Sequence, residues 1–195
     1  MKKQKAPKKQ RRAAKKRRRI IAYIATSADG YIARPDGSVD WLDRPMPKGQ
    51  YGMFEFFKTI DTIVWGRRTY SEALARGTKA SAYGKGTRHY VFSRTPQKSL
   101  EESVEFANGA IKSFAQELRA RPGKDIWMMG GGKIIASFLD EGEIDEFIIH
   151  MIPVFIGEGI PLIEPRHRSI PLEFVASKTF PDGVIRLNYR VGSPS

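Results

Sequence analysis

Cysteine is absent from all 195 residues of this chain. Its absence excludes disulfide bonds, zinc sites built on thiolates and a cysteine nucleophile. Histidine is scarce, and His89, His150 and His167 are too scattered along the sequence to suggest shared ligands. We therefore expect no metal site.

Long apolar runs are lacking as well. The first run, residues 20–25, is shorter than the roughly 7–15 apolar residues of a secretory signal. No segment approaches the roughly 20 apolar residues of a membrane-spanning helix. We expect a cytoplasmic protein that makes no membrane contact.

Acidic residues are missing from residues 1–19, which contain twelve Lys or Arg. Subtracting these twelve from the total of 34 leaves 22 basic residues against 21 acidic ones, so the net charge of +13 comes almost wholly from this tail. A segment so charged and so poor in apolar residues is expected to be disordered. The sequence predicts a disordered basic tail over residues 1–19 and one folded domain over residues 20–195.

The tail contains no aromatic residue on which a base could stack. Its charge favours polyanions through counterion release, so we expect non-specific polyanion contact through residues 1–19. A solvated extension without a specific partner is the simpler interpretation. A basic-tailed nucleic-acid-associated protein stays open as an alternative.

Three apolar, strand-like runs each end in residues suited to phosphate. The residues that follow the runs are GRRT (66–69), SRT (93–95) and GGGK (130–133). After such strands, helix N-termini bind phosphate through free N–H groups and the positive end of the helix dipole. Three such edges indicate one ligand with several phosphates, and we expect a nicotinamide dinucleotide with a 2′-phosphate, NADPH.

Each phosphate-friendly segment has its own chemistry. Three consecutive glycines exceed what a tight turn needs, and they let backbone N–H groups approach a pyrophosphate closely. Arg67 and Arg68 offer a fixed fork of donors to phosphate oxygens, and Thr69 can cap a helix or donate to a phosphate. Ser93 and Arg94 are expected on the other side of a 2′-phosphate pocket.

The remaining pattern predicts the fold class. Strand-like and helix-like segments alternate through the first part of the chain, and apolar residues recur at helical spacing over 111–118 and 134–139. Residues 174–180 and 184–191 form an antiparallel hairpin closed by Pro-Asp-Gly. We predict an α/β fold in which helices flank a central mixed, mostly parallel sheet, with a C-terminal antiparallel hairpin.

With these segments in place, residues 20–191 resemble the dihydrofolate reductase superfamily, nearest the reductase domain of bifunctional riboflavin-biosynthesis enzymes and its stand-alone homologues. The segments that carry the resemblance are IATSADGYIA (24–33), VDW (39–41), VWGRRTY (64–70), FSR (92–94), MGGGK (129–133) and PVFIGEGIPL (153–162). The resemblance implies a dihydrofolate reductase-like three-layer fold, NADPH as hydride donor and a homodimer. The interface is expected at residues 147–152 and the following loop, residues 153–163.

The resemblance adds Ala25 and Ile32 as residues that line the nicotinamide pocket. With the phosphate segments, the expected cofactor-binding residues are Ala25, Ile32, Gly66, Arg67, Arg68, Thr69, Ser93, Arg94, Met129, Gly130, Gly131, Gly132, Lys133 and Ile134.

The substrate side departs from the family pattern. Folate reductases carry a buried carboxylate near the position of Gln50 or Tyr51, and riboflavin reductases carry a glutamate just before their glycines, where Met129 stands here. Hydride transfer needs positioning and often one proton donor. We expect Asp40 or Glu55 in that catalytic role, Asp40 first because it adjoins Trp41.

The expected substrate-binding residues are Asp29, Trp41, Tyr51 and Phe54. Core packing is the competing interpretation for Phe54, and loop or exposed positions are the competing interpretation for the acids. The leading prediction is an NADPH-dependent oxidoreductase for a small, heterocyclic or carbonyl-type substrate. A catalytically inactive dinucleotide-binding protein is the alternative.

Overall fold

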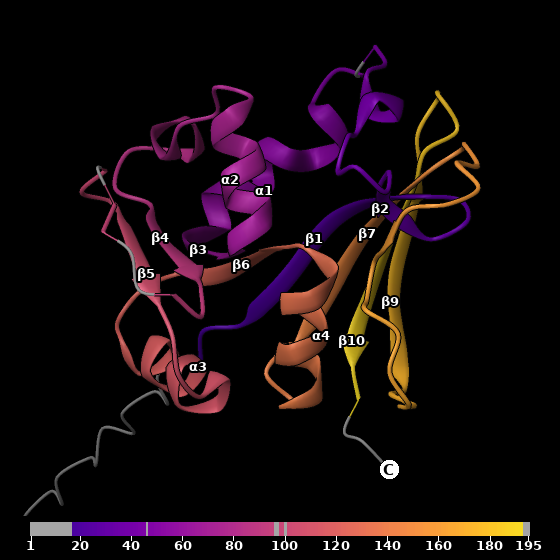
Figure 1. The fold of residues 1–195 in the computed structure, drawn as a ribbon. Coiled ribbons are helices and arrows are strands. Elements are labelled where there is room, and N and C mark those ends of the chain that lie inside the picture. Colours follow the sequence, from indigo (N-terminus) through magenta and orange to yellow (C-terminus); the bar gives the residue numbers. More distant parts are fainter. Residues whose placement is uncertain (1–16, 46, 96–97, 100, 193–195) are drawn as a thin grey trace, which may run out of the picture.

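A computed structural model describes residues 17–45, 47–95, 98–99 and 101–192. Ten strands and four α-helices are present in this part of the chain (Figure 1). The strands are β1 Ile20–Ser27, β2 Tyr31–Ala33, β3 Ile60–Gly66, β4 Arg88–Phe92, β5 Val104–Ala107, β6 Asp125–Gly130, β7 Glu146–Ile152, β8 Ile160–Pro161, β9 Leu172–Thr179 and β10 Ile185–Val191. The helices are α1 Met53–Thr59, α2 Arg67–Ala75, α3 Ile111–Ala120 and α4 Gly132–Asp140, with short 3-10 turns at Asp40–Leu42, Gln50–Gly52 and Ala80–Tyr83.

Eight strands form one sheet in the order β5-β4-β3-β6-β1-β7-β10-β9. The first six are parallel to their neighbours, whereas β10 runs antiparallel to β7 and to β9. β2 and β8 pair separately as a small antiparallel sheet. The predicted mixed, mostly parallel sheet with a C-terminal hairpin is confirmed.

Helices cover both faces of the sheet. α3 and α4 pack on the face that carries Ile20 and Phe147, and α1 and α2 pack on the face that carries Ile21 and Trp127. These alternating side chains enter different cores because successive residues of a strand point to opposite faces. The result is the expected three-layer arrangement.

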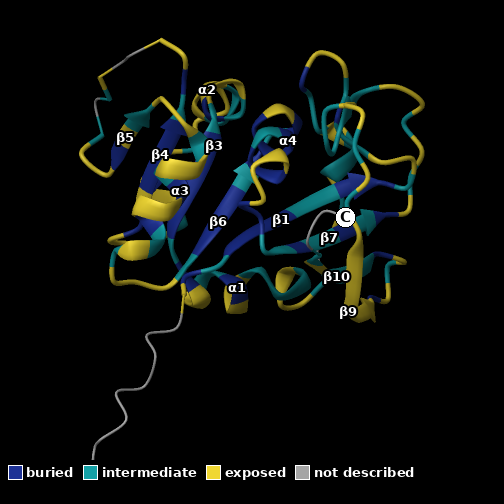
Figure 2. Ribbon diagram, turned by 90° about the horizontal axis from the view of Figure 1, so that it is seen from below, coloured by how far each residue is buried: buried dark blue, intermediate teal, exposed yellow. Residues whose placement is uncertain are grey.

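Strand β7 lies inside the sheet between β1 and β10. Its apolar side chains Phe147 and Ile152 are buried in the domain's own cores, whereas Ile148, Ile149 and Met151 are only partly buried. The interface expected at residues 147–152 and 153–163 stays a prediction. One of the two edge strands is β9, all eight residues of which are exposed (Figure 2). Leu172, Phe174 and Val175 are among them.

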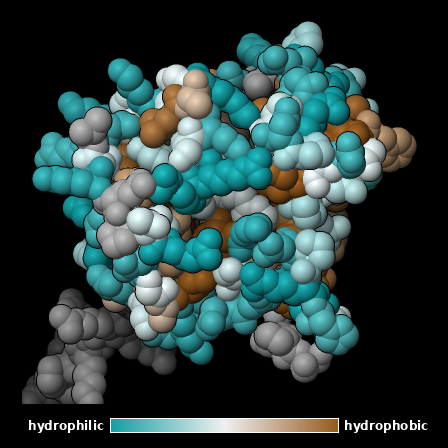
Figure 3. Space-filling model, in the orientation of Figure 1, coloured by the Kyte–Doolittle hydropathy of each residue, from teal (hydrophilic) through white to brown (hydrophobic). Residues whose placement is uncertain are grey.

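Hydrophilic residues cover most of the face seen in Figure 1, and apolar residues come into view in a recess near its middle (Figure 3). Among the described residues, no helix has both the length and the apolar character needed to cross a bilayer. In the same part of the chain, no three His, Cys, Asp or Glu side chains cluster closely enough to hold a metal ion.

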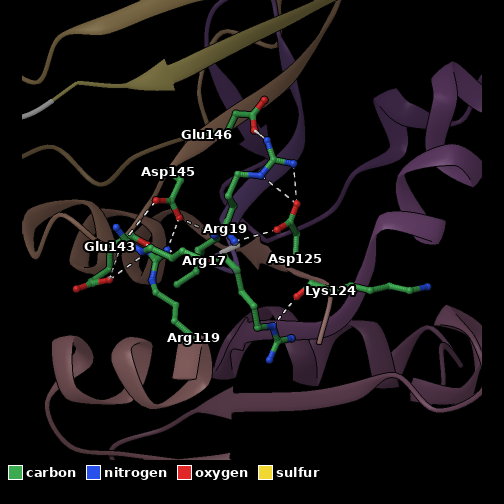
Figure 4. A network of polar contacts seen from close by, with 10 residues as sticks. Arg17, Arg19, Arg119, Lys124, Asp125, Glu143, Asp145 and Glu146 are labelled. Carbon is green, nitrogen blue, oxygen red and sulfur yellow. Dashed lines mark hydrogen bonds and ion pairs between the residues drawn. The ribbon is translucent and has the colours of Figure 1, made fainter. Parts of the chain in front are cut away.

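Arginines anchor the start of the domain. The Arg18 side chain is buried and donates to Asp61, to Thr62 Oγ1 at 2.7 Å and to the carbonyl of Leu118 at 3.0 Å. Arg19 pairs with Asp125 and with Glu146, each at 2.6 Å, within a larger network of charged side chains (Figure 4).

Two residues of the predicted tail, Arg18 and Arg19, are therefore held by the folded part of the chain. The composition of residues 1–19 predicts disorder, but these two side chains have acidic partners on β3, β6 and β7 that are distant in sequence. The rest of the predicted tail, residues 1–16, lies outside the described residues.

Candidate functional site

The carboxyl ends of β1, β3, β4 and β6 meet at one edge of the sheet, because these strands are parallel. A cavity of about 1190 Å³ opens there. Its lining includes all three phosphate-friendly segments, together with Ala25 at the end of β1. The tertiary structure thus brings together residues that lie more than a hundred positions apart.

All but one of the predicted cofactor-binding residues line the cavity. Those that line the cavity are Ala25, Ile32, Gly66, Arg67, Arg68, Thr69, Ser93, Arg94, Met129, Gly131, Gly132, Lys133 and Ile134. Gly130 does not; a Cβ on it would lie 3.3 Å from Ile135 and 3.5 Å from Ile24, toward the core. Its φ of +106° is in the region that favours glycine.

Three helices begin at the cavity wall. α2, α3 and α4 follow Gly66, Ala110 and Gly131, and none of these preceding residues caps its helix with a side-chain hydrogen bond. The first N–H groups of each helix lack intrahelical partners, and the helix dipole adds positive potential there. Asn108, two residues before Ala110, also lines the cavity.

Charges around the cavity are unevenly distributed. Its described lining contains five basic side chains, Arg67, Arg68, Arg76, Arg94 and Lys133, and one carboxylate, Glu72. Arg68 Nε pairs with Glu72 Oε1 at 2.7 Å. Arg67 has a weaker contact, a 3.3 Å hydrogen bond from its Nε to Ser71 Oγ. The excess of cations favours a polyanionic ligand.

The glycine turn after β6 is closely packed. A Cβ on Gly131 would lie 3.1 Å from Thr69 Oγ1, and one on Gly132 would lie 2.4 Å from the carbonyl oxygen of Pro161. The Gly130–Gly131 peptide bond is cis. Side chains at these positions would push α2 and the loop after β7 away from the start of α4. Glycine is therefore required here by close approach of the backbone.

The opposite wall comes from the loop that follows β2. Pro35, Gly37 and Val39 line the cavity. Arg76 Nη2 donates to the carbonyl of Gly37 at 2.7 Å, which ties this loop to α2. The loop therefore spans the cavity mouth between β2 and α2.

An apolar cluster adjoins the cavity at its Ala25 end. Ala25, Trp41, Leu42, Tyr51 and Val154 pack against buried Ile152, Phe180 and Val184. Ala25 and Leu42 belong to both the cavity lining and this cluster. Trp41 Nε1 is buried without a hydrogen-bond partner among the described residues. Trp41 and Tyr51, two of the predicted substrate-binding residues, are thus next to the cavity without lining it.

The predicted acids lie elsewhere. Asp40 pairs with Arg34 at 2.6 Å on the surface, and this contact lowers the pKa of Asp40. Glu55 is exposed on α1 and does not line the cavity. Asp29 accepts the backbone N–H of Gly157 at 2.8 Å and joins two loops. None of these three carboxylates lines the cavity. Catalysis by Asp40 or Glu55 and substrate binding by Asp29 stay predictions.

Phe54 is also displaced from its predicted place. It is exposed and absent from the cavity lining, whereas Phe56 is buried and stacks on Tyr23 with ring centroids 4.4 Å apart. Helix α1 has only seven residues, and its buried face follows Phe56 rather than Phe54.

His150, a polar residue beside the apolar cluster, was not predicted as a site residue. His150 on β7 pairs in register with Ala25, and its Nε2 lies 3.4 Å from both Tyr23 Oη and the carbonyl oxygen of Tyr51. Burial lowers the pKa of His150 to about 4. Tyr51 also donates to Asp182 in the hairpin turn, and burial raises the pKa of Tyr51 to about 12. Only the alternation of β7 hinted that His150 faces this side.

The cavity therefore suits a dinucleotide on three grounds. It is larger than the roughly 300–1,000 Å³ of an ordinary small-molecule site. It carries three uncapped helix N-termini for phosphates. Its Ala25 end is apolar and adjoins aromatic side chains, which suits a flat ring.

Comparisons with known proteins agree with this architecture. The sequence profile described as the RibD C-terminal domain matches residues 18–186. The Bacillus subtilis protein named "Uncharacterized protein YwjB" is 38% identical over 171 residues, which cover 88% of this chain and 97% of that one.

Solved structures share the fold. A Shewanella sp. PV-4 protein, provisionally named as a riboflavin biosynthesis protein, has a TM-score of 0.79 at 27% identity, covering 90% of this chain and 99% of that one. Dihydrofolate reductase from Enterococcus faecalis, in complex with NADP(H) and RAB-propyl, has a TM-score of 0.64 at 18% identity, covering 90% of this chain and 97% of that one. The fold is thus a dihydrofolate reductase-like α/β fold.

Proposed function

This chain belongs to the RibD C-terminal domain family, and on that premise we propose that it is an NADPH-dependent oxidoreductase acting on a small, heterocyclic substrate. The observation that carries the proposal is the meeting of the GRRT, SRT and GGGK segments at one cavity, with three uncapped helix N-termini and an excess of arginine. NADP(H) in the Enterococcus faecalis neighbour supports the choice of cofactor.

The proposal assigns a task to each part of the cavity. NADPH, when bound, supplies the hydride and leaves as NADP⁺, and a proton completes reduction of the substrate. Arg67 and Arg94 would hold the 2′-phosphate, and Thr69 with the glycine turn would hold the pyrophosphate. Ala25 and Ile32 would orient the nicotinamide beside the apolar cluster, where Trp41 and its neighbours exclude water.

A second candidate, a dinucleotide-binding protein without catalysis, is favoured by one observation. Neither Asp40 nor Glu55 lines the cavity, and its one lining carboxylate among the described residues, Glu72, is paired with Arg68. A reductase would then need a proton from another group near Ala25 or from water.

Calorimetric titration with NADPH and NADH tests the cofactor site. We expect tighter binding of NADPH than of NADH, and we expect Arg67→Ala to weaken NADPH binding by about tenfold, since a charge-assisted hydrogen bond contributes about 1.5–3 kcal/mol when well formed. Arg88→Ala is the matched control, because Arg88 is exposed but outside the lining. Equal binding of both cofactors, or an equal effect of the two substitutions, would contradict the 2′-phosphate assignment.

Oxidation of NADPH in the presence of dihydrofolate and ribosylated aminopyrimidines separates the two candidates. Turnover with any of them supports the reductase. Tight cofactor binding with no turnover across a broad panel of heterocycles and carbonyl compounds would favour the catalytically inactive protein.

We further propose a homodimer whose interface includes β9. This strand is one of the two edges of the sheet, and it exposes Leu172, Phe174 and Val175. An unpaired edge that exposes apolar side chains is suited to pairing with another chain.

A further inference from the structure

Glu72 is an acidic residue in a part of the cavity whose other charged side chains are basic and attract anions. Within the described residues it is the single acid of the lining, against five basic side chains. It lies on α2, one turn after Arg68, at the end of the cavity proposed to hold phosphate. A negative charge there opposes the binding of a phosphorylated ligand.

The two neighbouring arginines differ because of Glu72. Arg68 Nε is 2.7 Å from Glu72 Oε1, so its charge is already matched. Arg67 forms no ion pair with a described residue, and its Nε contacts only a hydroxyl group, Ser71 Oγ. Of two adjacent phosphate-type donors, one is available and the other is already paired.

The same carboxylate faces the loop across the cavity mouth, residues 34–38, here called the strap. A Cβ on Gly37 would lie 2.5 Å from Glu72 Oε1, so the carboxylate sits directly against the strap. Arg68 Nη2 reaches the carbonyl oxygen of Pro35 at 3.5 Å, and Arg76 holds the carbonyl of Gly37. Arg68, Glu72 and Arg76 therefore connect α2 to the strap.

We propose that Glu72 lowers cofactor affinity by occupying Arg68 in place of a ligand phosphate, so that a cofactor phosphate binds Arg68 by displacing this carboxylate. The inference rests on the proposed function and assigns Glu72 a role within that site. An exposed i,i+4 ion pair is weak, and a phosphate offers more oxygens and more charge to a guanidinium than a carboxylate does. The exchange therefore favours the phosphate while reducing its net affinity.

The test is titration of the full chain with NADPH and with NADH, for the natural protein, Glu72→Gln and Glu117→Gln. Glu117 is the matched control, since it pairs with Arg121 at i,i+4 on the surface of α3, away from the cavity. Release of Arg68 from its exposed ion pair is expected to tighten cofactor binding about threefold to fivefold in Glu72→Gln. Glu117→Gln should leave both affinities unchanged.

The two cofactors identify which phosphate competes. Tighter binding of NADPH alone would mean that the 2′-phosphate binds Arg68. Equally tighter binding of both cofactors would mean that the pyrophosphate binds Arg68. Either result supports the exchange of carboxylate for phosphate. Unchanged binding in Glu72→Gln overturns the inference, because no competition for Arg68 is then relieved. Weaker binding also overturns it, because the carboxylate would then position Arg68 for the ligand rather than compete with the ligand.

Repeating the titrations with Arg68→Ala proteins separates displacement of Glu72 from Arg68 from simple repulsion between Glu72 and the ligand phosphate. There, Glu72→Gln should change affinity by less than about twofold, since no ion pair is left to exchange. A full effect without Arg68 would overturn the inference. If the natural protein binds neither dinucleotide, the proposed function and this inference both fail; if it binds NADPH but Glu72→Gln has no effect, only this inference fails.

Discussion

The indole N–H of Trp65 donates to Nδ1 of His89 at 3.1 Å, between the neighbouring strands β3 and β4. Because Nδ1 accepts this hydrogen bond, the proton of the neutral ring is on Nε2. Burial lowers the pKa of His89 to about 4, as it does for His150. The folded protein therefore holds two neutral histidines inside its core.

These histidines predict acid sensitivity. An unfolded histidine, with a pKa near 6.5, takes up a proton between pH 6.5 and 4, whereas the folded one stays neutral, so protonation favours the unfolded state. The free energy of unfolding should fall as the pH is lowered through this window and stop falling from this cause below about pH 4. Each buried histidine accounts for up to about 3 kcal/mol of this fall in the free energy of unfolding.

Urea unfolding at a series of pH values checks this prediction. His89→Gln keeps an acceptor for Trp65 and should flatten the slope between pH 6.5 and 4, whereas the same change at exposed His167 should not. A slope that is unchanged in His89→Gln would show that other groups cause the acid sensitivity.

Two adjacent arginines should differ strongly in their contribution to stability. Arg18 is 6% exposed and pairs with Asp61, whereas Arg17 is 62% exposed and lies 3.8 Å from Asp145. Removing one partner of a buried pair costs about 3–5 kcal/mol, and the half-exposed Asp61 reduces this figure. We expect Arg18→Met to lower the free energy of unfolding by about 2–4 kcal/mol and Arg17→Met by less than about 0.5 kcal/mol.

Denaturant titration of the two variants decides the matter. A similarly small loss of unfolding free energy in both variants would mean that the domain starts after residue 19, as the composition predicts.

The glycine turn should tolerate a methyl group at one position better than at the next. In Gly132→Ala the new Cβ meets the backbone carbonyl of Pro161, which cannot move alone, and overpacking of this kind costs about 1–3 kcal/mol. In Gly131→Ala the nearest atoms are the side chains of Thr69 and Ile32, at 3.1 and 3.7 Å. We expect a lower Tm and weaker NADPH binding in Gly132→Ala, and a smaller change in Gly131→Ala.

Thermal unfolding and cofactor titration of both variants measure this difference. Equal tolerance at the two positions would mean that the segment after β7 adapts freely to the start of α4.

Two exposed phenylalanines distinguish the possible dimer interfaces. Phe174 lies on the edge strand β9, and Phe155 lies in the loop after β7, where the sequence placed the interface. A charge introduced into a buried apolar contact is strongly unfavourable, so Phe174→Glu should shift a dimer toward monomer, and Phe155→Glu should not. Sedimentation velocity checks the outcome. Dissociation by Phe155→Glu alone would place the interface at the loop instead.

Local patterns were enough to predict the fold class and to place the GRRT, SRT and GGGK segments at one edge of the sheet. Strand, turn and helix signals depend on neighbouring residues, so the glycine turn and the arginines could be located without knowing what they contact. Parallel strands then bring their carboxyl ends together wherever they pair, which is why Ser93 and Gly131 were placed at one site despite their separation.

Only the tertiary structure decided the positions of the acids and the limits of the domain. Asp29, Asp40 and Glu55 carry the same chemistry in any setting, and their neighbours in space determine whether they face a cavity, a backbone N–H or an arginine. Composition alone assigns Arg18 to a disordered tail, whereas its ion pair with Asp61 on β3 holds it in the folded domain. Periodicity marks faces of strands and helices, but partners distant in the sequence are settled by packing, because ion pairs and cavities form between elements that carry no local record of each other.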